Sequence, residues 1–148
     1  ERYDFTEVSG YFATNSRKQL SGDLDVTYGS FYNGTKLTMS SNINIRRQPW
    51  GNFGIAYTQN RVDLKEFGAT DLHLIGPRAE VSFSNKMFWT TFLQYNTQSE
   101  NFNINSRFQW RYKPMSDIFI VYTDNYTTTD LTVKNRGLVF KMTYWLNI

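Results

Sequence analysis

Apolar and polar residues alternate along most of this chain, and this two-residue period limits what the chain can fold into. From Leu20 to Tyr28 every second residue is apolar or glycine, and the residues between them are polar. The same alternation returns from Leu37, from Phe102 and from Leu138. Successive side chains of a β-strand point to opposite faces. The pattern therefore predicts strands with one apolar and one polar face.

Weaker alternation predicts further strands at residues 5–13, 53–62, 75–84, 87–95 and 118–122. Together the segments give about nine strands, and none has the period of a helix. The Asn33-Gly34 pair predicts a tight hairpin. Pro77 cannot donate a hydrogen bond to a neighbouring strand, which predicts a bulge, a strand start or an edge. We expect one all-β domain over residues 1–148.

Composition excludes several classes of protein. The absence of cysteine excludes disulfides, thiolate metal sites and cysteine nucleophiles. His73 is the single histidine, so histidine clusters are excluded, and no Gly-x-Ser-x-Gly motif lies near it. The 16 basic and 13 acidic residues are scattered, without the basic block of a nucleic-acid-binding arm. We therefore expect no enzyme, no metal or other cofactor, and no nucleic-acid partner.

Two architectures contain many alternating strands: a soluble barrel or sandwich with its apolar side inward, and a membrane barrel with its apolar side outward. The longest apolar runs have about five residues, whereas a membrane helix needs about 20. The pattern predicts short connections that alternate with longer ones, the latter at residues 63–72 and 123–135, as in outer-membrane barrels. Trp50, Trp89, Tyr112 and Trp145 near strand ends are typical of interfacial aromatic girdles. These features favour an antiparallel up-and-down transmembrane β-barrel.

The polar face of the predicted sheet is rich in basic residues. The residues expected to face the lumen are Arg46, Arg78, Glu80, Arg107, Arg111, Lys113 and Lys141. A basic lining favours anions in a pore. The alternative is a network of cross-strand ion pairs and hydrogen bonds that fills a narrow barrel. Asp23 and Asp25 share this face, where they would hold a cation or, as we favour, pair with arginines on adjoining strands.

An ordered series of motifs resembles a particular family. It includes Phe-Tyr-Asn-Gly-Thr at 31–35, Gln-Asn-Arg-Val-Asp-Leu at 59–64 and Asn-Ser-Arg-Phe-Gln-Trp-Arg-Tyr-Lys-Pro at 105–114, with shorter motifs between and after them. The series, over about residues 31–148, is similar to the C-terminal barrel of uncharacterised Bacteroidetes-type outer-membrane proteins. There, the barrel follows a module resembling a family-nine carbohydrate-binding domain. The resemblance implies the C-terminal part of a larger barrel in the outer membrane of a Gram-negative cell.

Two further observations agree with this expectation. Single-chain bacterial barrels have even strand numbers, and about nine is odd, which suggests missing strands. Alternation through Tyr144, Leu146 and Ile148 resembles the terminal strand by which bacterial outer-membrane barrels are recognised. If that strand ends in the periplasm, residues 47–51 and 113–116 are periplasmic, and residues 33–34, 63–72, 98–101 and 123–135 are external.

The sequence predicts a structural or partner subunit of an outer-membrane assembly, one concerned with polymer uptake or protein export. Its partners would be membrane lipids, other subunits of the complex or the rest of a larger barrel. The alternatives are a solute pore with a basic lumen and a soluble lipid-binding β-barrel. A lipid-modifying enzyme is disfavoured because no catalytic constellation is present.

Overall fold

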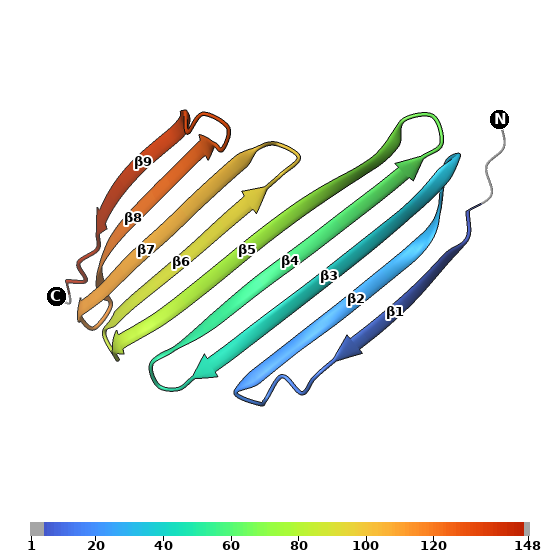
Figure 1. The fold of residues 1–148 in the computed structure, drawn as a ribbon. Coiled ribbons are helices and arrows are strands. Elements are labelled where there is room, and N and C mark those ends of the chain that lie inside the picture. The colour runs from blue at the N-terminus through green and yellow to red at the C-terminus, as the bar shows by residue number, and fades with distance from the viewer. Residues whose placement is uncertain (1–4, 147–148) are drawn as a thin grey trace.

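Nine antiparallel strands build the whole described structure. The computed structural model describes residues 5–146, which contain no helix (Figure 1). The strands are β1 (Glu7–Ala13), β2 (Leu20–Phe31), β3 (Gly34–Arg47), β4 (Gly51–Leu64), β5 (Gly68–Ser84), β6 (Met87–Asn96), β7 (Asn101–Lys113), β8 (Ser116–Thr127) and β9 (Val133–Met142). Each strand pairs with its neighbours in sequence, in the order β1 to β9. The prediction of an all-β, up-and-down arrangement is confirmed.

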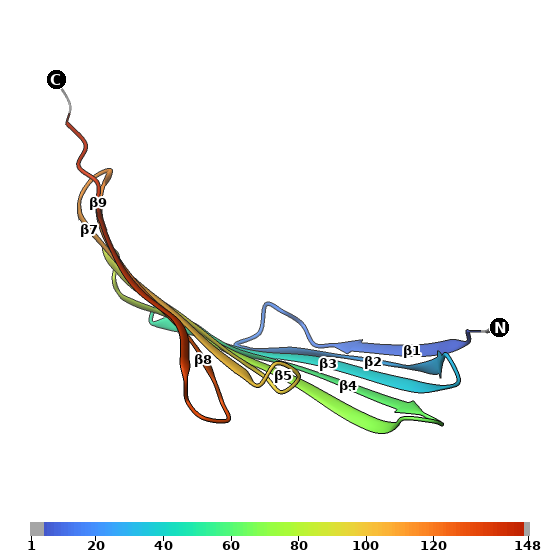
Figure 2. The same ribbon diagram turned by 90° about the horizontal axis from the view of Figure 1, so that it is seen from above.

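The sheet is open and has one layer. Figure 2 shows a single curved sheet with no second layer against either face. Among residues 5–146, β1 pairs only with β2 and β9 only with β8, so these two strands form the edges. The sequence predicted a barrel, but residues 5–146 form an open sheet that does not close. Because β1 and β9 run in the same direction, pairing them would place one parallel seam in an otherwise antiparallel sheet.

Strand register assigns each residue to a face. Directly opposed residues of an antiparallel pair lie on the same face. Arg46 lies opposite Asn52, Asn52 opposite Glu80, and Thr90 links Glu80 to Arg107. We call the face that carries this row the polar face. It includes every residue that strand pairing and alternation place on the same side of the sheet. The other face, which carries for example Ile43 and Phe108, is the apolar face.

Large hydrophobic side chains are exposed on the apolar face. No hydrophobic residue among the described ones is buried, so this part of the chain has no hydrophobic core. The exposed ones in regular strand pairing on this face are Val8, Phe12, Leu20, Leu24, Tyr28, Ile43, Ile45, Phe53, Ile55, Trp89, Trp110, Ile120, Leu138, Phe140 and Met142. Tyr11, Phe92 and Val139 are the exceptions on the polar face. The sequence period thus produces a sheet with one apolar side.

The connections gather at two rims. The lower rim in Figure 1 has the connections 14–19, 48–50, 85–86 and 114–115, and the upper rim has 32–33, 65–67, 97–100 and 128–132. The prediction of long loops at residues 63–72 and 123–135 is wrong, because most of these residues belong to strands β4, β5, β8 and β9. Positive φ angles at Tyr32, Gly68 and Leu131 let the chain reverse within a few residues. The difference in connection length between the rims is therefore small.

Two local expectations also need correction. Pro77 lies inside β5, opposite Ile55 of β4, and is neither a strand start nor an edge. Regular pairing of β5 with β6 is interrupted at residues 76–77 and resumes in the same register, so the missing N–H leaves a gap and no bulge. Strand β9 ends at Met142, so Tyr144 and Leu146 lie beyond it, and Ile148 lies outside the described residues.

Substitutions at two glycines test how closely neighbouring strands approach each other. A Cβ atom added at Gly34 would overlap the carbonyl oxygen of Asp63, whereas one added at Gly10 would meet no atom within 4 Å. We expect Gly34→Ala to lower the free energy of unfolding by about 1–3 kcal/mol because the backbone must shift. Gly10→Ala should leave it nearly unchanged. Denaturant titration followed by tryptophan fluorescence measures both, and equal losses would contradict the pairing of β3 with β4.

Candidate functional site on the polar face

Most of the predicted lumen residues lie together on the polar face. Arg46, Glu80 and Arg107 belong to one row across β3 to β7, and strand alternation puts Arg78, Arg111 and Lys141 on the same face. Lys113 departs from this group. A register shift between Arg111 and Lys113 pairs Lys113 with Ser116, and its Nζ lies 5.4 Å from the centre of the Tyr144 ring.

The acidic residues of this face neutralise part of its basic charge. Arg78 forms an ion pair with Glu80, two residues along the same strand. Asp117 accepts a hydrogen bond from Gln109 Nε2 at 3.1 Å and lies 3.4 Å from Arg111 Nε. The sequence interpretation missed Asp117, whose opposition to Arg111 depends on the register of the β7–β8 hairpin. The polar face is thus closer to charge balance than expected.

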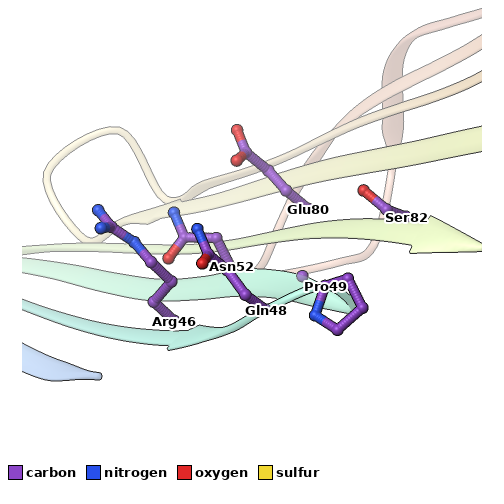
Figure 3. A pocket seen from close by; sticks show the side chains of 7 residues that line it. Arg46, Gln48, Pro49, Asn52, Glu80 and Ser82 are labelled. Carbon is purple, nitrogen blue, oxygen red and sulfur yellow. The ribbon is translucent and has the colours of Figure 1, made fainter. Parts of the chain in front are cut away.

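A shallow hollow lies beside the lower rim (Figure 3). Arg46, Asn52 and Glu80 project to the same side of the sheet, and Gln48, Pro49, Gly51 and Ser82 complete the lining of the hollow. The side chain of Arg46 makes no ion pair with any described residue. Residues 5–146 contain no cluster of three His, Asp or Glu side chains that could hold a metal ion. The hollow offers hydrogen-bonding and charged groups to an open space.

Polar side chains form cross-strand pairs farther along β2, β3 and β4. Asn42 Nδ2 donates to Asp23 at 2.8 Å, and Thr38 Oγ1 donates to Asn60 at 2.9 Å. The expected pairing of Asp23 and Asp25 with arginines is therefore not seen among the described residues, because asparagine occupies the position opposite Asp23. These directly opposed pairs fix the strand register on the side that lacks apolar packing.

His73 lies on the apolar face within β5, near the upper rim. Its Nδ1 is 2.9 Å from the hydroxyl of Tyr57, and the two rings stack with centres 6.0 Å apart. Thr97 binds the backbone of His73, with its Oγ1 accepting from the His73 N–H at 2.8 Å. His73 and Tyr57 thereby form a polar and aromatic pair near the rim.

The apolar face also carries a charged network that the sequence did not reveal. The side chain of Asp124 is 4% exposed, and its Oδ2 accepts hydrogen bonds from Tyr122 Oη at 2.8 Å and from Arg136 Nη2 at 2.7 Å and Nε at 3.0 Å. Its Oδ1 is buried without a partner. The network spans β8 and β9 near the upper rim. Arg136 compensates a carboxylate that would otherwise be buried alone.

Comparisons with known proteins give no match. No family model, no curated protein and no solved structure matches this chain. The resemblance to a Bacteroidetes-type barrel family stays a prediction from motifs. Function is therefore inferred from the chemistry of the two faces and the two rims.

The Asp124 network predicts a non-additive effect on stability. Arg136→Met leaves the buried Asp124 carboxylate with Tyr122 as its one side-chain donor and with no compensating charge, so we expect a clear drop in unfolding temperature. The double variant Asp124→Leu with Arg136→Met removes both charges and should lose less. Arg107→Met, which removes an arginine without an ion pair in the described structure, serves as the matched control. Thermal unfolding measures all three, and a double variant at least as unstable as Arg136→Met would contradict the network.

Proposed function

We propose that this chain forms part of the wall of an outer-membrane β-barrel, with its apolar face against lipid and its polar face toward the lumen. In this role it is a structural or partner subunit of an outer-membrane assembly, of the kind that takes up polymers or exports proteins. One observation carries the proposal: a sheet of nine strands has one apolar face, and no hydrophobic residue among those described is buried.

Water is a poor solvent for such a sheet. Soluble domains bury the apolar side of a sheet under a second layer, and they seldom expose large contiguous apolar patches. Here that side is open from β1 to β9 (Figure 2). A bilayer covers it without any further protein layer. Strands β2 to β9 have 10 to 17 residues, and a tilted membrane strand needs about 9–11.

A lipid environment also requires partners for the two sheet edges. Open edges do not occur in the hydrocarbon region, because every backbone polar group there needs a hydrogen bond. Since β1 and β9 run in the same direction, an entirely antiparallel closure needs an odd number of additional strands between them. The rest of a larger barrel or a partner subunit would supply these strands. This requirement favours a structural role within an assembly.

A solute pore with a basic lumen is the second candidate. Arg46, Arg107 and Lys141 favour it, because they lie on the polar face without an ion pair to a described residue. The acidic partners of Arg78 and Arg111 count against strong anion selectivity. Conductance across a planar bilayer separates the two functions. A steady current that favours anions would support the pore, and no current from inserted protein would support the structural role.

Neighbouring residues of β9 provide a direct test of the two faces. Phe140 is on the apolar face and Lys141 on the polar face. We expect tryptophan at position 140 to be strongly quenched by brominated lipid, and tryptophan at position 141 to be quenched weakly. The experiment uses single-tryptophan variants in which the four native tryptophans are phenylalanine.

The same measurement separates the membrane barrel from a soluble one. A soluble barrel with the apolar side inward would shield position 140 from lipid. Folded protein in vesicles without quenching at position 140 would therefore refute the proposed lipid contact, and equal quenching at both positions would refute the assignment of the faces.

Sidedness gives a second prediction. Because β9 runs toward the lower rim, a periplasmic end to that strand puts Met115 in the periplasm and Thr128 outside. The chain has no cysteine, so single replacements label cleanly. We expect Thr128→Cys to react with an impermeant thiol reagent on whole cells and Met115→Cys to react only after the outer membrane is opened. The reverse pattern would show the opposite topology.

A further inference from the structure

The two rims of the sheet differ in charge. The connections of the lower rim contain Arg17, Lys18 and Lys86 and no acidic residue. Those of the upper rim contain Glu66, Glu100 and Asp130 with Lys65 as the one basic residue. Hydrogen bonds from Thr132 hold the pKa of Asp130 below its ordinary value, so this carboxyl group is ionised at neutral pH. The connections of the two rims thus carry opposite net charge.

The basic groups of the lower rim are free to bind a ligand. Arg47, the last residue of β3, lies on the apolar face beside this rim. The side chains of Arg17, Lys18, Arg47 and Lys86 are exposed, and none forms an ion pair or a side-chain hydrogen bond with a described residue. Long basic side chains at a membrane boundary extend their charged groups to the lipid phosphates while their methylene groups stay on apolar surface.

The tryptophans give an independent observation. All four lie toward the lower rim: Trp50 in a connection, Trp89 and Trp110 near the lower ends of β6 and β7, and Trp145 after β9, where the backbone N–H of Trp145 donates to Ser116 Oγ at 3.0 Å. Trp50, Trp145 and Met115 are more than half exposed. Tryptophan prefers the headgroup level of a bilayer. Free cations and tryptophans therefore occupy the same level of the sheet.

From these two observations we propose that the lower rim binds the headgroups of anionic phospholipids. The inference rests on the proposed function and specifies it: the bound leaflet is the one that meets the lower rim, which is the inner leaflet if that rim is periplasmic. The cations contact the phosphate and the net negative charge, and the tryptophans lie at the carbonyl level below them. Zwitterionic lipids offer the phosphate but no net charge, so they bind more weakly.

The test uses the native tryptophans as local reporters. The full chain is reconstituted in vesicles of phosphatidylcholine that contain brominated phosphatidylglycerol or, separately, brominated phosphatidylcholine. Competition between the two gives the relative binding constant of the anionic lipid. We expect a value above one that falls toward one at high salt. A basic residue near an anionic surface strengthens binding by about fivefold.

A matched pair of variants assigns the effect to one rim. Arg47→Glu with Lys86→Glu reverses two charges at the lower rim. Arg61→Glu with Lys65→Glu reverses two near the upper rim, where Arg61 lies on the apolar face close to the end of β4 and Lys65 in the connection that follows. We expect the first variant to lose the preference for phosphatidylglycerol by at least about fivefold and the second to keep it. If the first variant folds poorly, Arg47→Gln with Lys86→Gln replaces it, with a smaller loss of the same sign.

The outcomes separate this inference from the proposed function. Equal quenching by the two brominated lipids, or equal losses in the two variants, would overturn the anionic-lipid site while leaving membrane insertion intact. A lower rim that selects a soluble anionic polymer and not phosphatidylglycerol would overturn it as well. Absence of quenching by either lipid in folded protein would instead overturn the proposed function.

Discussion

The structure depends on one constraint, which is that a single-layer sheet with one apolar side needs an apolar medium against that side. Burial of apolar area is the main favourable contribution to folding. In the described residues no hydrophobic side chain is fully buried, so the sheet by itself supplies only a small part of that contribution. Lipid would supply it along the whole apolar face. The function, location and partners proposed for the chain all follow from this requirement.

The backbone imposes the second requirement. Antiparallel pairing supplies hydrogen-bond partners for the backbone of the inner strands, but the outward edges of β1 and β9 have no partner among the described strands. In water such edges promote aggregation, and in hydrocarbon they are not tolerated. The parallel directions of β1 and β9 disfavour simple closure between them. A wall segment completed by other strands satisfies the backbone and the apolar face together, whereas an isolated sheet satisfies neither.

Polar interactions complete the sheet in two different ways. On the polar face, opposed pairs such as Thr38 with Asn60 are local, half-exposed and consistent with a hydrated or filled lumen. On the apolar face, Asp124 and Arg136 place a compensated charge near the upper rim, where the apolar character of that face ends. Tryptophans and free cations mark the opposite rim. The sheet therefore differs between its two faces, and the connections of its two rims differ in charge.

The sequence by itself determined the strands and their two faces, because side-chain direction in a strand has a period of two and is local. It therefore predicted about nine strands, and it placed Arg46, Glu80 and Arg107 on one face. Register, by contrast, depends on pairing between segments, so Asp117 beside Arg111 and Asp124 beside Arg136 emerged only from the tertiary structure. Lys113 left the group because a register shift precedes it. The open edges were likewise decided only in three dimensions, since closure depends on sheet curvature and strand direction over the whole chain.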